Sequence, residues 1–374
     1  MTPHRARYVM IGGFLGAGKT TSILRAAAWF SARGLRVGIV TNDQAGGLVD
    51  TALTRSRDLA VEEIAGGCFC CRFSSLVEAA ERLSRETAPD VLLAEPVGSC
   101  TDLVATVSLP LARIYGARFT VAPVSVVVDP LRALRVLAPA QAAAGGFSAN
   151  VAYIYRKQLE EAEIVVVNKS DLLDADARQR VASLLEAAAP TARIVEVSAR
   201  QGSGLDVWFN ALLDHDSSPR SLADIDYDRY AAGEAALGWL NAEVRIGDPE
   251  GVEWDGNTRL PAILSAIRDA VARQGGEIAH LKGTLSPAGD DLDLAAANLV
   301  RTAGTVELSH RLIDPIDGGR LLVNLRAEAD HEQLLRGFQE GLAAACPDLP
   351  VAVVHCEHFF PGRPVPEHRM VATG

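Results

Sequence analysis

The chain has 374 residues, 48% of them hydrophobic, so it is long enough for two domains that each bury a sizeable core. The formal net charge of -11 has the wrong sign for a nucleic-acid-binding protein, and no basic stripe occurs. No apolar run approaches the roughly 18 residues that a membrane span requires, and no secretory segment is recognisable. We therefore expect a cytoplasmic protein without nucleic-acid or membrane partners.

The first motif is a glycine-rich loop between an expected strand at 8–11 and an expected helix from Thr20 to about Arg33. It has the GxxxxGK[ST] spacing of a P-loop, in which backbone N–H groups surround a polyphosphate. Lys19 is expected to neutralise the β- and γ-phosphates, and the Thr20 hydroxyl to bind Mg²⁺. The expected phosphate-binding residues are Gly13, Gly16, Ala17, Gly18, Lys19, Thr20 and Thr21.

Three cysteines within four residues, Cys68, Cys70 and Cys71, form the second motif. They cannot all form disulfides, and a soft divalent cation would relieve the repulsion between neighbouring thiolates. Zn²⁺ fits best, although Cu(I) or cobalt would accept the same ligands. The fourth position is open to water, to a partner's group, or to a carboxylate such as Glu62, Glu63 or Asp43. A redox-active thiol cluster and inert buried thiols are the alternatives.

The third motif follows the expected strand at 164–167 and reads Asn168, Lys169, Ser170, Asp171, which is NKxD. The Asp171 carboxylate can accept hydrogen bonds from N1–H and the 2-amino group of guanine, whereas adenine lacks this donor pair. Beyond the next expected strand, at 194–197, Ser198 and Ala199 could place a backbone N–H near guanine O6. This combination selects GTP rather than ATP.

The pattern of elements predicts a mostly parallel, doubly wound α/β sheet of the P-loop NTPase class over residues 1–214. Further strands are expected at 36–41, 91–94 and 125–128. A polar linker at 215–236 would lead to a smaller α+β domain at 237–374. There the order is a strand near 238–246, a helix at 260–273, a strand at 278–285, a hairpin over 305–326, a helix at 331–345 and a strand at 351–355, which suggests a ferredoxin-like fold.

Cysteines and histidines elsewhere carry no chemistry in this interpretation. On a strand, His355 and Glu357 would point to one face and Cys356 and His358 to the other, so we expect a structural role for this group. Cys100 and Cys346 are expected to be buried as small hydrophobic residues.

The chain resembles the CobW family of P-loop GTPases. The resemblance lies in the P-loop at 12–21, the Gly-Cys-Phe-Cys-Cys motif at 67–71, the Glu95-Pro96-Val97-Gly98 element and the approach to the NKxD loop at 158–171. It covers the first half of the chain and implies a GTPase that delivers a metal, often zinc. It also implies that Lys19, Asp43 and Glu95 act in hydrolysis and that Thr20, Asp43 and Glu95 hold Mg²⁺.

The resemblance implies a mechanism in which hydrolysis of GTP to GDP and phosphate changes the affinity of the cysteine cluster for its metal. The client would be an apo-metalloenzyme, a homodimer is one open arrangement, and intrinsic turnover would be slow. The segment around Asp43 departs from the family pattern because it lacks an aromatic residue, and a histidine-rich storage segment is absent. Alternatives are a chaperone of cobalamin or corrinoid enzymes, which would handle cobalt, and a nucleotide-gated thiol redox sensor.

Overall fold

The computed structural model describes residues 5–42, 60–64, 67–138, 146–219, 222–249, 251–289 and 293–371. These residues form two compact units. The first contains the described residues up to Gly233 together with the segment that begins at Arg363, and the second contains those from Glu234 to Gly362. Within the described residues, no helix is long and apolar enough to cross a bilayer.

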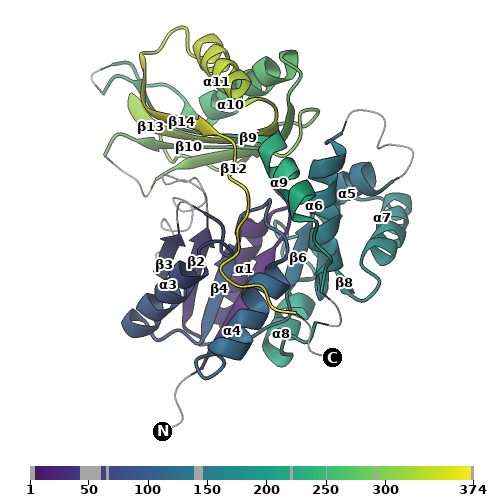
Figure 1. Cartoon of the computed structure of the whole chain (residues 1–374). Coiled ribbons are helices and arrows are strands. Elements are labelled where there is room, and N and C mark those ends of the chain that lie inside the picture. The colour runs from purple at the N-terminus through teal and green to yellow at the C-terminus, as the bar shows by residue number, and fades with distance from the viewer. Residues whose placement is uncertain are drawn as a thin grey trace. The chain divides into compact units, whose positions relative to one another are not determined.

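The first unit is built on a sheet whose neighbouring strands are parallel, in the order β3-β2-β4-β1-β6-β7-β8, with β5 also paired to β1. The strands are β1 (Ala6–Gly12), β2 (Val37–Asn42), β3 (Ala60–Ile64), β4 (Val91–Glu95), β5 (Phe119–Val121), β6 (Ser125–Val128), β7 (Ile164–Val167) and β8 (Arg193–Glu196). Figure 1 shows β3, β2 and β4 side by side. The prediction of a mostly parallel α/β sheet is confirmed.

Helices cover both faces of this sheet. They are α1 (Lys19–Ser31), α3 (Phe73–Glu86), α4 (Leu109–Ile114), α5 (Pro130–Leu137), α6 (Ala149–Glu160), α7 (Ala175–Ala188), α8 (Leu205–Asp214) and α9 (Tyr227–Ala236), with a π-helical turn at Val104–Ser108 and a 3₁₀ turn at Ser170–Leu172. On β1, Val9 and Ile11 pack with α1 and α8, while Tyr8 and Met10 point to the opposite face and are equally buried. This burial on both faces explains the continuous apolar run of β1.

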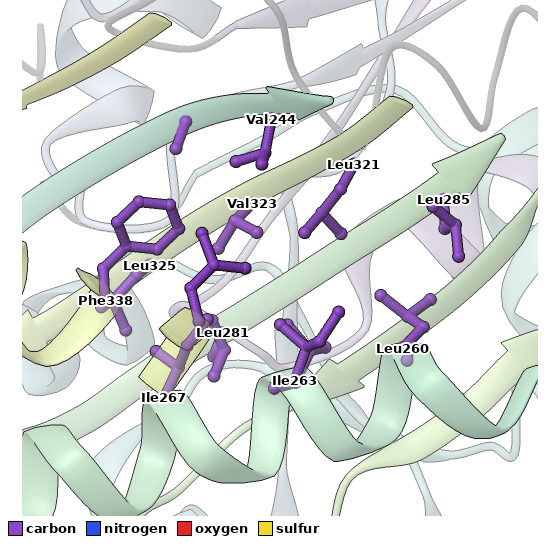
Figure 2. Packing of buried hydrophobic residues seen from close by; sticks show 14 of the residues in the cluster. Val244, Leu260, Ile263, Ile267, Leu281, Leu285, Leu321, Val323, Leu325 and Phe338 are labelled. Atoms are coloured by element: carbon purple, nitrogen blue, oxygen red, sulfur yellow. The ribbon is translucent and has the colours of Figure 1, made fainter. Parts of the chain in front are cut away.

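The second unit is an antiparallel sheet in the order β12-β11-β10-β13-β9-β14. Its elements are β9 (Leu237–Gly247), α10 (Gly256–Arg273), β10 (Glu277–Pro287), β11 (Ala295–Leu299), β12 (Glu307–His310), β13 (Gly318–Glu328), α11 (His331–Ala345) and β14 (Val351–Phe359). The order β9-α10-β10-β13-α11-β14 is the ferredoxin-like arrangement that the sequence suggested, with β11 and β12 added beside β10. Figure 2 shows Leu260, Ile263 and Ile267 of α10 against the apolar face of this sheet.

The predicted hairpin over 305–326 is wrong. The strand β12 pairs with β11, whereas β13 lies between β10 and β9. The partner of each strand is set by side-chain packing with residues far away in the sequence, which a local pattern does not report.

Candidate functional site

The glycine loop lies between β1 and α1, at the carboxyl edge of the parallel strands. Gly13, Gly16 and Gly18 have positive φ angles of 128°, 76° and 99°, which glycine adopts without strain. A Cβ atom at Gly18 would lie 2.3 Å from Asn168 Nδ2, so only glycine fits against the loop that follows β7. Backbone curvature of this kind directs N–H groups inward around an anion.

The residues at the start of α1, which follow the glycine loop, differ in how far their side chains are buried. Lys19 and Thr20 are buried, whereas the side chain of Thr21 is exposed. Thr20 Oγ1 donates a hydrogen bond to Glu95 Oε1 at 3.0 Å, so the start of α1 is joined to the end of β4. A Cβ atom at Gly98 would lie 3.0 Å from Lys19 Nζ, which shows how closely the Glu95–Gly98 element approaches the phosphate loop. Asp43 lies outside the described residues.

The NKxD loop is attached to the phosphate loop through its first two side chains. Asn168 Nδ2 donates to the carbonyl of Ala17 at 3.0 Å, and Asn168 Oδ1 accepts from Ala199 N at 2.9 Å. The N–H that the sequence assigned to guanine O6 therefore donates to Asn168 within the protein. Ser198 is buried, and Asp171 is exposed at the surface of the 3₁₀ turn.

Lys169 has a left-handed backbone with φ 55°, and its ammonium group bridges the Gly16 carbonyl at 3.0 Å and Asp129 Oδ2 at 2.7 Å. Burial would raise the pKa of Asp129, but the charges and hydrogen bonds of Lys169 and Arg132 together outweigh it and keep that pKa below its ordinary value. Sequence reasoning missed Asp129. The sequence did contain a signal, because Asp129 directly follows β6 and the other predicted site residues also directly follow strands.

The three cysteines of the second motif converge. The Cys68 Sγ atom lies 2.9 Å from that of Cys70 and 3.1 Å from that of Cys71, and the last two are 3.8 Å apart. Cys68 and Cys70 are buried, and Cys71 is partly exposed. Hydrogen bonds from the thiols of Cys100, Cys70 and Cys71 lower the pKa of Cys68 well below its ordinary value. Hydrogen bonding to Cys68, with a contribution from burial, raises the pKa of Cys71 to about 11. Three converging sulfurs are a soft donor set suited to a thiophilic cation.

A segment near the C-terminus contacts this cluster, which the sequence did not predict. Val365 N donates to Cys71 Sγ at 3.2 Å, and Glu367 N donates to the Cys70 carbonyl at 2.9 Å. The Glu367 carboxylate accepts from Ser74 N and Oγ at 2.9 and 2.6 Å. The segment thus covers the side of the cluster on which Cys71 is partly exposed.

The histidines of the second unit form a separate group. His358 Nδ1 lies 2.8 Å from His331 Nδ1, and a Glu332 oxygen lies within 4.8 Å of both rings. Glu357 instead accepts from Asn241 at 3.0 Å, and Cys356 packs against the core. His331 is the first residue of α11, and the positive partial charge of this N-terminal end disfavours a cation beside it. The 2.8 Å between the two Nδ1 atoms fits an N–H···N hydrogen bond. We therefore assign the histidine pair a structural role.

Comparison with known proteins agrees with the geometry of the first unit. A model of the CobW/HypB/UreG nucleotide-binding domain matches residues 7–196. The chain is similar to the zinc chaperone YeiR of Escherichia coli (strain K12), with 31% identity over 171 residues, or 46% of this chain and 48% of that protein. It is also similar to the zinc chaperone CobW of a Sinorhizobium species, with 28% identity over 201 residues, or 46% of this chain and 53% of that protein. The matches span about half the length of these relatives.

Two solved structures are also similar. Zn(II)-bound YjiA GTPase from E. coli aligns with 91% of this chain and 99% of its own, at 13% identity and a TM-score of 0.37. HypB from Helicobacter pylori in complex with nickel aligns with 56% of this chain and 87% of its own, at 18% identity and a TM-score of 0.41.

Proposed function

Because the chain belongs to the CobW/HypB/UreG family of nucleotide-binding domains, we propose that it is a GTP-hydrolysing metallochaperone whose cargo is Zn²⁺. The observation that carries the proposal is the convergence of Cys68, Cys70 and Cys71 in a nucleotide-binding fold. Relatives named as zinc chaperones support the choice of cargo. The client would be an apo-metalloenzyme that accepts the ion.

The phosphate loop and the NKxD loop would hold GTP together. Lys19 would face the β- and γ-phosphates, and Asp171 would accept from N1–H and the 2-amino group of guanine. The fit is supported by the backbone of the glycine loop, because a Cβ at Gly13 would lie 2.2 Å from the Val127 carbonyl oxygen and one at Gly18 would strike Asn168. The hydrogen bond from Asn168 to the Ala17 carbonyl would hold the NKxD loop and the phosphate loop in the relative position that GTP needs before GTP binds.

Thr20 and Glu95 would hold Mg²⁺, with Asp43 as a further ligand. The 3.0 Å hydrogen bond between Thr20 Oγ1 and Glu95 Oε1 supports this, because the two oxygens already lie together at the start of α1. A bound Mg²⁺ would supply positive charge to the transferring phosphoryl group. Lys19 would neutralise the same group, and Glu95 or Asp43 would orient the attacking water.

The test separates the two sites. We expect Lys19→Ala to lose GTP binding but keep stoichiometric zinc. The triple variant Cys68→Ser, Cys70→Ser, Cys71→Ser should lose zinc by elemental analysis and keep its affinity for a GTP analogue. Cys356→Ser, at a cysteine outside the cluster, is the matched control and should retain both. Equal zinc content in the triple variant and the wild type would refute the metal site, and unchanged phosphate release by Lys19→Ala would refute the GTPase.

A further inference from the structure

The C-terminal segment, residues 363–371, approaches the cysteine cluster with two prolines, Pro364 and Pro366, on either side of Val365. A proline fixes its own φ near about −65° and restricts the residue before it to extended conformations, so the stretch favours extended backbone. A stretch fixed in this way loses little conformational entropy when it binds a surface. The Val365 side chain is 68% exposed, so its packing does not explain how the stretch is held.

The backbone donors of this stretch hold it in place. Because proline has no N–H group, only Val365 and Glu367 can donate within residues 364–367. Val365 N donates to Cys71 Sγ at 3.2 Å, and Glu367 N donates to the Cys70 carbonyl at 2.9 Å. Both donors are thus directed at the cysteine turn, and one of them reaches a sulfur. An N–H···S hydrogen bond stabilises a thiolate and therefore favours the metal-bound form of Cys71.

Side chains of the segment contact the helix that begins after the cysteine turn. Helix α3 starts at Phe73, and its own N-cap residue, Arg72, makes no capping hydrogen bond with its side chain. The Glu367 carboxylate takes that role, because Ser74 N and Oγ donate to its Oε2 at 2.9 and 2.6 Å. The His368 ring packs edge-on against Phe73, with centroids 5.0 Å apart. The segment therefore contacts both the cysteine turn and the helix after it.

The other end of the segment is attached to the loop that follows β4. Arg369 Nε donates to Asp102 Oδ2 at 2.7 Å, and Met370 N donates to the Ala105 carbonyl at 2.9 Å. The same loop begins at Glu95, whose carboxylate accepts a hydrogen bond beside the phosphate loop. One short segment thus connects the cysteine turn with the loop that reaches the nucleotide site.

We propose that the C-terminal segment is the gate of the metal site and that the 95–105 loop controls this gate from the nucleotide site. When closed, the segment donates to Cys71 Sγ and covers the side on which this sulfur is partly exposed, so the ion is retained. When displaced, it removes the hydrogen bond and opens that side to the client. Val365 is then a positioning residue that acts through Cys71. This inference rests on the proposed function, because it describes how the same ion is retained and released.

Control by the nucleotide follows from the contacts at residues 369 and 370. A nucleotide state that displaces Asp102 and Ala105 weakens the ion pair and the backbone hydrogen bond there, so the segment leaves Cys71 more readily. By linkage, a metal that holds the segment closed favours the opposite nucleotide state by the same factor.

The first experiment compares Val365→Pro with Val365→Ala in the full chain, loaded with one equivalent of Zn²⁺ or Co²⁺. Both remove the exposed side chain, but only proline removes the N–H, and extended backbone accepts proline. We expect zinc to pass to a chelator about tenfold faster from Val365→Pro than from Val365→Ala, whose rate should equal that of the wild type. The sulfur-to-cobalt charge-transfer absorption should shift in Val365→Pro alone, because Cys71 Sγ loses a hydrogen bond.

The second experiment uses Asp102→Asn, which keeps an oxygen for Tyr227 but loses the charge that pairs with Arg369. Asparagine also tolerates the left-handed backbone at this position, where φ is 64°. The matched control is Asp228→Asn, because Asp228 pairs with Arg363 at the exposed surface. Zinc transfer is measured with GDP and with a non-hydrolysable GTP analogue. The ratio of the two rates should differ from one in the wild type and the control and approach one in Asp102→Asn.

Each variant is first checked for the cooperative urea unfolding of the wild type. Glu367→Ala, which removes the cap of α3, replaces Val365→Pro if that variant does not fold, and it should also release zinc faster. Arg369→Gln replaces Asp102→Asn in the same way and should give the same ratio.

The outcomes separate this inference from the proposed function. Equal transfer rates from Val365→Pro and Val365→Ala would overturn the gate, and an unchanged cobalt absorption would overturn the role of the hydrogen bond to Cys71. A wild-type ratio of one, or the wild-type ratio in Asp102→Asn, would overturn control from the nucleotide site. All of these results leave the three-cysteine site intact. Zinc content that survives the triple serine substitution would instead refute the proposed function and this inference together.

Discussion

Glu161 provides a sharp test of how the 95–104 loop is held. Its carboxyl group follows α6 and is buried, with Oε1 accepting from Thr101 Oγ1 at 3.1 Å and Oε2 accepting from Val104 N at 3.0 Å. Burial, and secondarily the charge of Asp102, raises the pKa of Glu161 to about 8 against these hydrogen bonds. The carboxyl group is therefore protonated at neutral pH in the folded protein and ionised in the unfolded chain.

The sign of the effect follows from proton linkage. The folded-state pKa is raised above the unfolded value of about 4.3, so the protonated group stabilises the fold fully below pH 4 and this stability is lost as the pH rises to 8. The loss is about 1.4 kcal/mol per pH unit, or about 3 to 4 kcal/mol between pH 4.3 and pH 7. Glu161→Gln removes the titration. Its amide oxygen can accept from Val104 N, and its NH₂ can donate to Thr101 Oγ1.

The assay is urea unfolding of wild type and Glu161→Gln at pH 5, 6, 7 and 8. We expect the advantage of the variant in unfolding free energy to grow by about 1.4 kcal/mol for each pH unit between 5 and 7 and to begin to level off near pH 8. Glu160→Gln is the matched control, because the neighbouring Glu160 is exposed and pairs with Lys157 at 2.7 Å. A difference between Glu161→Gln and wild type that stays constant from pH 5 to pH 8 would refute the reasoning.

Three further substitutions test the site. Asn168→Ala leaves the Ala17 carbonyl and the Ala199 N–H without their partner. We expect it to lower the free energy of unfolding by about 2 to 4 kcal/mol and to weaken the binding of a GTP analogue, measured by titration calorimetry. Unchanged values of both quantities would contradict this role of Asn168. Gly98→Ala places a methyl group 3.0 Å from Lys19 Nζ. We expect it to weaken the binding of a GTP analogue about tenfold or more. Equal affinity in the variant and the wild type would show that the loop shifts to accommodate the methyl group at little cost in free energy. Arg369→Ala breaks the 2.7 Å ion pair that joins the C-terminal segment to buried Asp102, whereas Arg363→Ala, the control, breaks only an exposed ion pair. We expect zinc to pass to a chelator several-fold faster from Arg369→Ala than from Arg363→Ala. Equal transfer rates would show that the C-terminal segment does not protect the cysteine cluster.

The parts that the sequence predicted well depend on residues close together in the chain. The P-loop and the strand before the NKxD loop were recognisable because glycine spacing and β-branched runs are local signals, and the predicted strands at 125–128 and 164–167 have the observed bounds of β6 and β7. The helix α11 also begins and ends where the sequence placed it, at His331 and Ala345.

The missed strands lack such local signals. The strand β3 contains two glutamates, β5 has only three residues, and β11 consists largely of alanine, which has a low strand propensity. Each becomes a strand because a neighbouring strand supplies its hydrogen bonds. The return of the 363–371 segment to Cys71 is non-local in the same way, and no pattern within a short window could have indicated it.

The loop from Glu95 to Val104 joins the phosphate loop to the C-terminal end of α6. Glu95 accepts a hydrogen bond from Thr20 beside the phosphate loop, and Gln158 of α6 donates to the carbonyls of Gly98 and Cys100. Glu161, which follows α6, accepts from Thr101 and Val104. A coupling of metal and nucleotide binding needs little energy in such an arrangement. One hydrogen bond made in only one nucleotide state, worth about 1 kcal/mol, changes the relative metal affinity about fivefold, and two such bonds change it about 30-fold. A loop that moves as a unit can make or break that many contacts at once, so a coupling of this size needs no large movement of the chain.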